Sequence, residues 1–467
     1  MIELLTLLKA EMILTGLIFL LLFIKIGKGI ANDTLLPLIQ LLLLLNFIAG
    51  FVANVNGSVF GGMFYTDNLV VFEKNLLSGG VYLLSLVMSD WLKKCPHLSE
   101  FFLLLLSSLL GFFFLLSSRH LLLFYLSLEL AIIPVAALAN FDLERKRASE
   151  AAIKLILSSA FSSAILLFGI SMVYGTTGTL DFATLSSQLN GSTLQLLSFV
   201  FIVAAFAFKL SIVPFHLWTA DVYEGAPVPV TAYLSVISKG ASAFVFMTFL
   251  YRIFQSYLEL WYSVLVILAL ITLLIGNLFA LRQQNIKRFL AFSSIAQVGF
   301  ILVGMTGNNV GAFASVLYFI LIYIFSNLAA FGVVAVISAH TNKEQIEDYN
   351  GLYQNNPFLS WVLVIALFSL AGIPPTAGFF GKLYLLTAGG TNAAYWFILV
   401  AALNMIISLY YYLRVVRAVF AGAAENPIQP LPIQPAVKLG LIICSAGIII
   451  AGVWGTVYDF ISKLINL

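Results

Sequence analysis

The chain has 467 residues, of which 61% are hydrophobic and only 9% are charged, with a net charge of +3. Soluble domains are roughly 45–50% apolar and about 25% charged, so water is not the main solvent of this fold. The small, dispersed positive charge does not indicate nucleic-acid binding. The two cysteines, Cys95 and Cys444, and the four histidines show no metal-ligand spacing, and no glycine-rich phosphate loop follows a strand-like segment. We therefore expect a membrane protein without a redox, nucleotide or metal site of its own.

The hydrophobic segments predict an all-α polytopic membrane protein. Crossing the hydrocarbon core takes about 20 apolar residues, and charge, Pro, Gly or Asn marks the loops between crossings. By this rule the chain contains fourteen predicted transmembrane helices. In chain order they are 12–29, 35–55, 69–91, 99–117, 121–139, 150–174, 194–218, 228–251, 259–281, 288–306, 311–338, 357–388, 392–419 and 437–460. An even number of crossings puts both termini on the same side.

Positive charge predicts which side that is. Lysine and arginine gather in alternate loops, including Arg145–Arg147 and Lys287–Arg288, and are sparse in the others. Because short cytoplasmic loops retain Lys and Arg, both termini are predicted to lie outside the cytoplasm. Glu73 and Lys74 fall near the end of the third predicted helix. We expect them to anchor the chain at the interface or to contact a neighbouring subunit.

Two of the predicted helices contain prolines at membrane depth. Pro214 lies in the seventh, Pro374 and Pro375 lie in the twelfth, and the spacing from Leu210 to Pro214 equals that from Leu370 to Pro374. An ordinary proline kink explains either helix alone. The matched pair instead predicts two five-helix units, helices 4–8 and 9–13, which enter the membrane from opposite sides because five is odd. In such inverted repeats, discontinuous helices line polar cavities.

This organisation predicts four segments. Residues 1–98 form an N-terminal three-helix segment, residues 99–256 the first repeat, residues 257–422 the second repeat, and residues 423–467 contain helix 14. The helices before the two breaks carry a further weak similarity, since FSS at 161–163 corresponds to FSN at 325–327.

Five charged side chains fall within the predicted helices: Glu129, Lys154, Lys209, Lys239 and Lys382. A charge at the bilayer centre costs roughly 2.5–3.5 kcal/mol on insertion scales, so an unpaired set is retained only for a use such as proton relay, ion coordination or substrate binding. An ammonium group only donates hydrogen bonds, which excludes cation coordination by the lysines. Burial lowers the pKa of a lysine and a nearby carboxylate raises it, so such a group can switch its proton on and off.

We therefore expect a proton relay in which Glu129 pairs with Lys209, Lys154 modulates that pair, and Lys239 and Lys382 continue the path through waters. The alternative interpretation for Lys154 is a side chain that snorkels to the interface, since it lies near the start of its helix. Local unwinding at the breaks offers an alternative for Lys209 and Lys382, because it would hydrate them. His216, just after Pro214, is either a relay member or an interfacial helix-end residue.

Three long segments resemble a known family. They are FKLSIVPFHLWTADVYEGAP at 208–227, NIKRFLAFSSIAQVGF at 285–300 and SLAGIPPTAGFFGKLYLL at 369–386. These segments are similar to those of the subunit N/subunit 2 family of antiporter-like membrane subunits of NADH-quinone oxidoreductase, respiratory complex I. The resemblance runs from about Phe64 to Arg417. It implies fourteen helices, discontinuous helices 7 and 12, and one of several proton channels driven by quinone reduction elsewhere in the complex.

The resemblance also places the relay residues of the family. Its helix-5 glutamate falls on Glu129, and its lysines of helices 6, 7, 8 and 12 fall on Lys154, Lys209, Lys239 and Lys382, which are the residues that bilayer energetics selects. This chain departs from many relatives at one further position.

Where those relatives have histidine in helix 10, this chain has Gln297, which can hold a water but cannot titrate. The link between Lys239 and Lys382 is therefore the weakest part of the predicted path, and we expect ordered water there.

The resemblance implies that flavin, iron–sulfur clusters, NADH and quinone bind partner subunits, with no cofactor in this chain. It implies other complex I membrane subunits on both sides, the lipid bilayer as surroundings, a bacterial inner membrane location, and no catalysis by the isolated chain. Lysine in helix 12 and the absence of a long extension after Leu467 favour the subunit N type over related subunits. The alternative is a subunit of a multisubunit cation/proton antiporter, which would move sodium, and a path of lysines does not favour that ion.

Overall fold

A computed structural model describes residues 2–27, 29–52, 54–143, 145–390, 395–422 and 426–465. Helices dominate this part of the chain, and its only strands, β1 (Gly57–Val59) and β2 (Phe64–Thr66), form a short antiparallel hairpin before the third long helix. Twelve of the described helices are long and apolar enough to cross a membrane, and the apolar helix Pro357–Ala371 is shorter. The chain is a multi-pass membrane protein, while the count of fourteen crossings stays a prediction.

Sixteen described helical elements, several of them short, begin before the end of the first predicted repeat at residue 256. They are α1 (Ile2–Leu7), α2 (Lys9–Ile26), α3 (Asn32–Ala49), α4 (Asn68–Val87), α5 (Ser89–Lys94), α6 (Leu98–Ser117), α7 (Leu121–Ala139), α8 (Lys146–Thr177), α9 (Phe182–Gln188), α10 (Thr193–Leu210), α11 (Leu217–Gly225), α12 (Val228–Tyr233), η1 (Leu234–Ser238), α13 (Lys239–Thr248), η2 (Phe249–Ile253) and η3 (Gln255–Tyr257).

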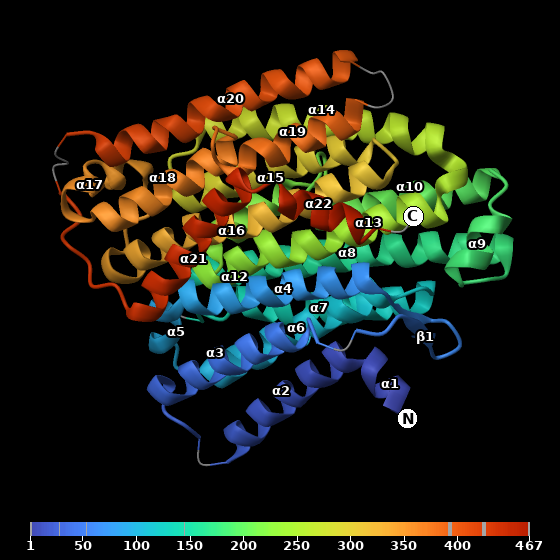
Figure 1. Cartoon of the computed structure of the whole chain (residues 1–467), viewed down its shortest axis with the longest axis horizontal. Helices are drawn as coiled ribbons and strands as arrows, with labels where there is room; N and C mark the ends of the chain where they lie inside the picture. Colours follow the sequence, from blue (N-terminus) through green and yellow to red (C-terminus); the bar gives the residue numbers. More distant parts are fainter. Residues whose placement is uncertain are drawn as a thin grey trace.

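The remaining elements are α14 (Leu258–Arg282), α15 (Ile286–Met305), α16 (Val310–Thr341), η4 (Ile346–Tyr349), α17 (Leu352–Asn355), α18 (Pro357–Ala371), α19 (Ala377–Gly389), α20 (Tyr395–Phe420), α21 (Pro435–Val453) and α22 (Thr456–Lys463). The predicted start of a helix at 392 and the predicted segment boundary at 423 lie outside the described residues. The long helices run side by side, and both termini lie toward the end of the bundle that carries β1 and α9 (Figure 1).

The structure contains matched features in the two predicted repeats. In the first, Leu121 N–H donates to the Leu180 carbonyl at 2.8 Å and Phe182 N–H donates to the Arg119 carbonyl at 3.0 Å. In the second, the same pair of bonds joins Ile286 to Glu344 at 2.8 Å and Ile346 to Gln284 at 2.7 Å. The helices between these bonds, α8 and α16, are both 32 residues long.

The matched segments lie at opposite ends of the bundle. Helix α9 follows the first pair of hydrogen bonds and α17 follows the second, and Figure 1 shows these two short helices at opposite ends. Close helix pairs are matched as well: a Cβ added at Gly111 of α6 would lie 2.4 Å from Ala131 N of α7, and one at Gly276 of α14 would lie 2.8 Å from Ala296 N of α15. These correspondences support an inverted repeat, although the four segment boundaries stay predictions.

The helix before each break ends in the same way. Ser211 and Gly372 both adopt positive φ, of 62° and 85°. The next residue then donates its N–H five positions back, from Ile212 to the Ala207 carbonyl and from Ile373 to the Phe368 carbonyl. This is the left-handed cap that satisfies carbonyls at a helix C-terminus.

Aligning these caps corrects the register predicted from the leucine-to-proline spacing. Each cap residue lies three positions before a proline, so Pro214 corresponds to Pro375 rather than to Pro374. The cap geometry determines where each helix ends, and the preceding leucine does not.

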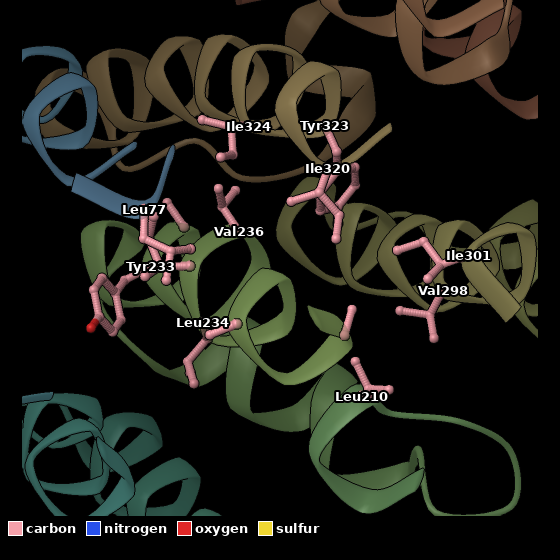
Figure 2. Packing of buried hydrophobic residues seen from close by; sticks show 14 of the residues in the cluster. Leu77, Leu210, Tyr233, Leu234, Val236, Val298, Ile301, Ile320, Tyr323 and Ile324 are labelled. Atoms are coloured by element: carbon pink, nitrogen blue, oxygen red, sulfur yellow. The ribbon is translucent and has the colours of Figure 1, made fainter. Parts of the chain in front are cut away.

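Helices of the predicted N-terminal segment and of the second predicted repeat pack against the segment that carries Lys239. Figure 2 shows Val236 of η1 near Leu77 of α4 and Ile324 of α16, with Tyr323 and Ile320 along the same helix. Leu77, Val236 and Ile320 are at most 1% exposed. The segment 228–253 thus lies in the packed interior, where its polar groups need protein or water partners.

Candidate functional site: a line of buried lysines

Three lysines are buried in the interior of the helix bundle. Lys209 lies one residue before the end of α10, Lys239 opens α13, and Lys382 lies in α19. Their side chains belong to residues that are 9%, 3% and 0% exposed. None of the three forms an ion pair with a described carboxylate. A buried ammonium without a counter-ion is costly, which points to a function at these positions.

Lys209 contacts a polar group of the neighbouring helix. Its Nζ donates to Ser159 Oγ of α8 at 2.8 Å. A cavity of about 20 Å³ adjoins Lys209 and is also lined by Ser159, Trp218 and Ser238, and a second of about 10 Å³ is lined by Lys209 and Ser242. About 10–15 Å³ is enough for one water. Because Ser238 and Ser242 lie close to Lys239 in sequence, both cavities adjoin the helical segment that carries the next lysine.

Glu129 does not form the predicted ion pair with Lys209. It is half-buried on α7, and its Oε1 has no hydrogen-bond partner among the described residues. The carboxylate still lies close enough to Lys209 to act on it electrostatically. The hydroxyl of Ser159 occupies the contact that the prediction gave to Glu129.

Lys239 follows a single turn of π-helix. Turns of this kind inside α-helices frequently mark functional sites, and here the turn is η1. Lys239 Nζ donates to Ser294 Oγ of α15 at 2.5 Å and lies 5.5 Å from the ring centroid of Tyr223 in α11. The hydroxyl and the aromatic ring partly replace the water that the ammonium loses on burial.

Gln297 lies in a continuous hydrogen-bonded group, rather than in a gap. Ser293 Oγ and the Tyr412 hydroxyl are 2.5 Å apart, and Gln297 Nε2 donates to the Tyr412 hydroxyl at 3.0 Å and to the Leu370 carbonyl at 2.9 Å. Lys382 Nζ donates to the same Leu370 carbonyl at 2.7 Å. Gln297 Oε1 is buried and has no described partner, so it marks a position that a water can satisfy.

Lys382 also closes the first half of the broken helix. Its Nζ donates to the Ala371 carbonyl at 3.2 Å and lies 4.6 Å from the centroid of the Phe300 ring. Cations at a helix C-terminus interact favourably with its orphan carbonyls. The break that ends α18 therefore supplies the polar partners of this lysine.

Lys154 lies in a surface cluster of charges, in contrast to its predicted place beside Lys209. Its side chain is 42% exposed and pairs with Glu150 of its own helix and with Asp221 of α11, each at 2.7 Å. Arg288 of α15 pairs with the same Asp221 at 2.8 Å and with Glu224 at 3.0 Å. These groups line a hollow of about 210 Å³. Lys154 is only two turns from the start of α8, so its side chain reaches water, as the snorkelling interpretation predicted.

This charge cluster holds α11 between the two predicted repeats, because Lys154 belongs to α8 and Arg288 to α15. Burial alone would raise the pKa of the Asp221 carboxyl, but hydrogen bonds from Lys154 and Arg288 outweigh it and bring that pKa below its ordinary value. Helix α11 also carries Trp218, which lines the Lys209 cavity, and Tyr223, which lies over Lys239.

The residues at the two helix breaks and the nearby His216 differ in exposure. Pro214, Pro374 and Pro375 are exposed on the isolated chain, whereas His216 is 7% exposed and its Nδ1 lacks a described hydrogen-bond partner. His216 lies within electrostatic range of Lys239. This placement favours the interior interpretation of His216 over an interfacial one.

Sequence reasoning missed the polar and aromatic groups around the lysines and Gln297. Ser159 and Ser294 accept hydrogen bonds from Lys209 and Lys239, and the Tyr223 ring lies over Lys239. Tyr412 forms hydrogen bonds with Gln297 and Ser293. The string SSIAQ in helix 10 contained a signal, because two serines and a glutamine within five residues are unusual in a predicted apolar span. No group of His, Cys, Asp and Glu that could hold a metal ion is found within the described residues.

The transmembrane family model for NADH:quinone oxidoreductase and Mrp antiporter subunits matches residues 118–408. The chain belongs to this family. It is 46% identical to NADH-quinone oxidoreductase subunit N of Phocaeicola vulgatus over 409 residues, which are 87% of each chain.

Two solved structures place the family fold in larger assemblies. A chain of respiratory complex I from Thermus thermophilus is 27% identical, has a TM-score of 0.83, and matches over 96% of this chain and 97% of its own length. A chain of the Mrp complex from a Dietzia species has a TM-score of 0.85 at 19% identity, over 97% and 96% of the two chains, and shows the shared fold alone. The family matches span the predicted relay region, including both helix breaks.

Proposed function

We propose that this chain is a proton-translocating membrane subunit of an NADH-quinone oxidoreductase. It is a non-redox part of that translocase, and the isolated chain catalyses no reaction. The similarity to subunit N over most of both chains supports this assignment. Moving one charge against the membrane potential costs about 2.3 kcal/mol per 100 mV, and quinone reduction in partner subunits supplies that energy.

The buried lysines carry the protons in this proposal. Lys209, under the electrostatic influence of Glu129, is the entry site, Lys239 is the central site, and Lys382 is the terminal site. The observation that carries the proposal is the polar group from Ser293 to Lys382, which begins beside Ser294, the partner of Lys239. A carbonyl and an amide do not themselves relay protons, so waters at the unpartnered oxygen of Gln297 complete the path.

Lys154 has a different role in this proposal. It lies at the exposed mouth of the bundle and holds α11, instead of exchanging protons with Lys209 directly. His216 and Gln297 remain supporting members of the path. The path thus depends on three buried lysines and one half-buried carboxylate, with the Lys154 cluster outside them.

The surroundings follow from the same assignment. Other complex I membrane subunits lie on both sides of this chain in a bacterial inner membrane, and both termini lie on the non-cytoplasmic side. Flavin, iron–sulfur clusters, NADH and quinone belong to partner subunits. The second candidate, a subunit of a multisubunit cation/proton antiporter, rests on the fold shared with the Mrp chain. Sodium-dependent proton movement in vesicles that contain only this chain would favour it.

The test uses Lys209→Ala and Glu129→Ala in the assembled, membrane-embedded complex. We expect both variants to lower NADH-driven quinone reduction and the proton movement coupled to it, with the complex still assembled. Lys438→Ala is the matched control, since Lys438 is exposed. Wild-type rates and proton stoichiometry in both buried-site variants would exclude the relay.

A further inference from the structure

A second set of buried charges lies outside the lysine line. Glu73 and Lys74, expected from the sequence to be interfacial anchors, are only 3% and 2% exposed in α4. Lys74 Nζ pairs with Glu11 Oε1 of α2 at 2.5 Å, and Glu11 is also buried, at 2%. The anchor prediction is therefore wrong for this pair, because α2 and the β-hairpin cover α4 at this level.

Glu73 takes no part in that ion pair. Adjacent residues of a helix point about 100° apart, so Glu73 faces away from the partner of Lys74. Its Oε1 is buried and has no hydrogen-bond partner among the described residues. No described cation lies within ion-pair distance of it.

Helix α4, which carries Glu73, packs against the segment that carries Lys239. A Cβ added at Gly80 would meet Ile237 Cδ1 at 2.6 Å, and one added at Gly240 would meet Leu77 Cδ2 at 3.7 Å. Leu77 is therefore level with Gly240, the residue after Lys239, and Figure 2 shows it packed against this segment. Glu73 precedes Leu77 by four residues, so it lies on the same face about 6 Å further along the helix axis.

Glu73 lies between the level of Leu77 and one end of the bundle. The α4 chain runs back from Glu73 to the β-hairpin, at the end of the bundle where both termini lie (Figure 1). The charged groups within electrostatic range of Glu73 are Asp67 before α4, Arg119 between α6 and α7, Arg252 of η2, and Lys74 with its own partner on α2. Asp67, Arg119 and Arg252 are partly exposed, so charged groups near Glu73 reach the surface of the chain.

We propose that Glu73 is a proton-release group for the Lys239 site. The Lys239 ammonium gives one proton through water to the Glu73 carboxylate, leaving a neutral amine and a neutral carboxylic acid. Glu73 then gives the proton to water beside Arg119 and Arg252, whose positive charges favour the return of the carboxylate. One proton moves and no other bond changes. This inference rests on the proposed relay function.

A purely structural Glu73 would be a counter-ion or a hydrogen-bond acceptor. The absence of a described hydrogen-bond partner for Oε1 argues against the acceptor, and the absence of a described ion pair argues against a direct counter-ion. The nearby pair of Glu11 and Lys74 offers a matched control, because it is equally buried and neutral as a whole.

The experiment compares Glu73→Gln with the double variant Glu11→Gln/Lys74→Met in the complete complex, reconstituted in vesicles. Glutamine keeps the size and polarity of Glu73 but cannot bind and release a proton. We expect Glu73→Gln to reduce proton movement several-fold and to alter its dependence on the pH of the release side. Glu73→Asp should restore part of the rate. The double variant should retain the wild-type pH dependence.

Lys239→Ala is measured in parallel to separate the two proposals. If Lys239→Ala lowers proton movement and Glu73→Gln does not, the relay stands and the release role of Glu73 is excluded. If neither has an effect, the relay itself fails. If the double variant reproduces the altered pH dependence, the whole buried cluster acts structurally and the release role is excluded as well.

Discussion

Two groups of lysines in this chain have different surroundings. In the interior, Lys209, Lys239 and Lys382 contact hydroxyl, carbonyl and aromatic groups and no described carboxylate. At the mouth, Lys154 is 42% exposed and contacts two carboxylates within 2.7 Å. A lysine held by fixed anions keeps its proton, whereas one held by neutral groups can lose it. The buried lysines are therefore suited to proton transfer, and the exposed cluster around Lys154 is suited to holding α11 in place.

The largest effect is expected at the terminal lysine. Lys382→Met keeps the length of the side chain but removes its proton and its hydrogen bonds to the Leu370 and Ala371 carbonyls. We expect the proton-transfer step to slow on the order of 100-fold, as for other losses of a positioned acid–base group. Stopped-flow measurement of proton uptake in vesicles tests this, with Lys438→Met as the exposed control. An unchanged rate would remove Lys382 from the interior path.

A smaller effect is expected at the amide link. Gln297→Leu removes the hydrogen bonds to Leu370 and Tyr412 and the site for water at Oε1, so coupled turnover should fall roughly tenfold or less, the range of about 1.4 kcal/mol. Gln297→His restores a polar ring and should retain most of the rate. Quinone reduction and proton movement are measured together. Equal rates for Leu and His would show that no water chain passes this residue.

A substitution in the charge cluster around Lys154 is expected to have a weaker effect still. Asp221→Asn removes the acceptor shared by Lys154 and Arg288, so α11 should loosen and turnover should fall by a factor of a few. Asp221→Glu keeps the shared carboxylate and should recover part of that loss. If Asp221→Asn and Asp221→Glu behave alike, the cluster does not position α11 through this contact.

The smallest effect concerns stability and pH. The folded pKa of Asp221 lies below its ordinary value, so its contribution to stability is present above about pH 4 and is lost as the pH falls through the folded pKa. At neutral pH, Asp221→Asn should be less stable by about 1 kcal/mol, since the pair is partly exposed. Thermal unfolding in detergent should show this difference at pH 7 and a smaller one at pH 3. A constant difference would contradict the ionic origin.

Much of this arrangement follows from the sequence. Insertion costs identify Lys209, Lys239 and Lys382, because an apolar helix has no other reason to carry them. The prolines indicate both breaks. Lys154 looks equivalent in sequence, but its burial depends on how far α8 extends beyond the membrane, and local hydropathy does not encode that.

Contacts between distant segments could not be predicted from the sequence, for a similar reason. The link from Gln297 to Leu370 and Tyr412 joins three helices, and only their packing brings the residues together. Glu73 and Lys74 illustrate the opposite error. They appeared interfacial from their place near a helix end, but α2 and the hairpin cover them. Sequence gives the depth of a residue along its own helix and does not give what other elements cover it.

The two glycine contacts between neighbouring helices have a mechanical consequence. At Gly111 and Gly276 the backbones of α6 and α7, and of α14 and α15, approach so closely that even a methyl group would collide with the partner's main chain. Helix pairs packed this closely cannot approach further, and their interlocked surfaces resist sliding. We therefore expect any strain that accompanies proton movement to be absorbed where helical regularity is already interrupted, around Ser211, the π-turn before Lys239, and Gly372.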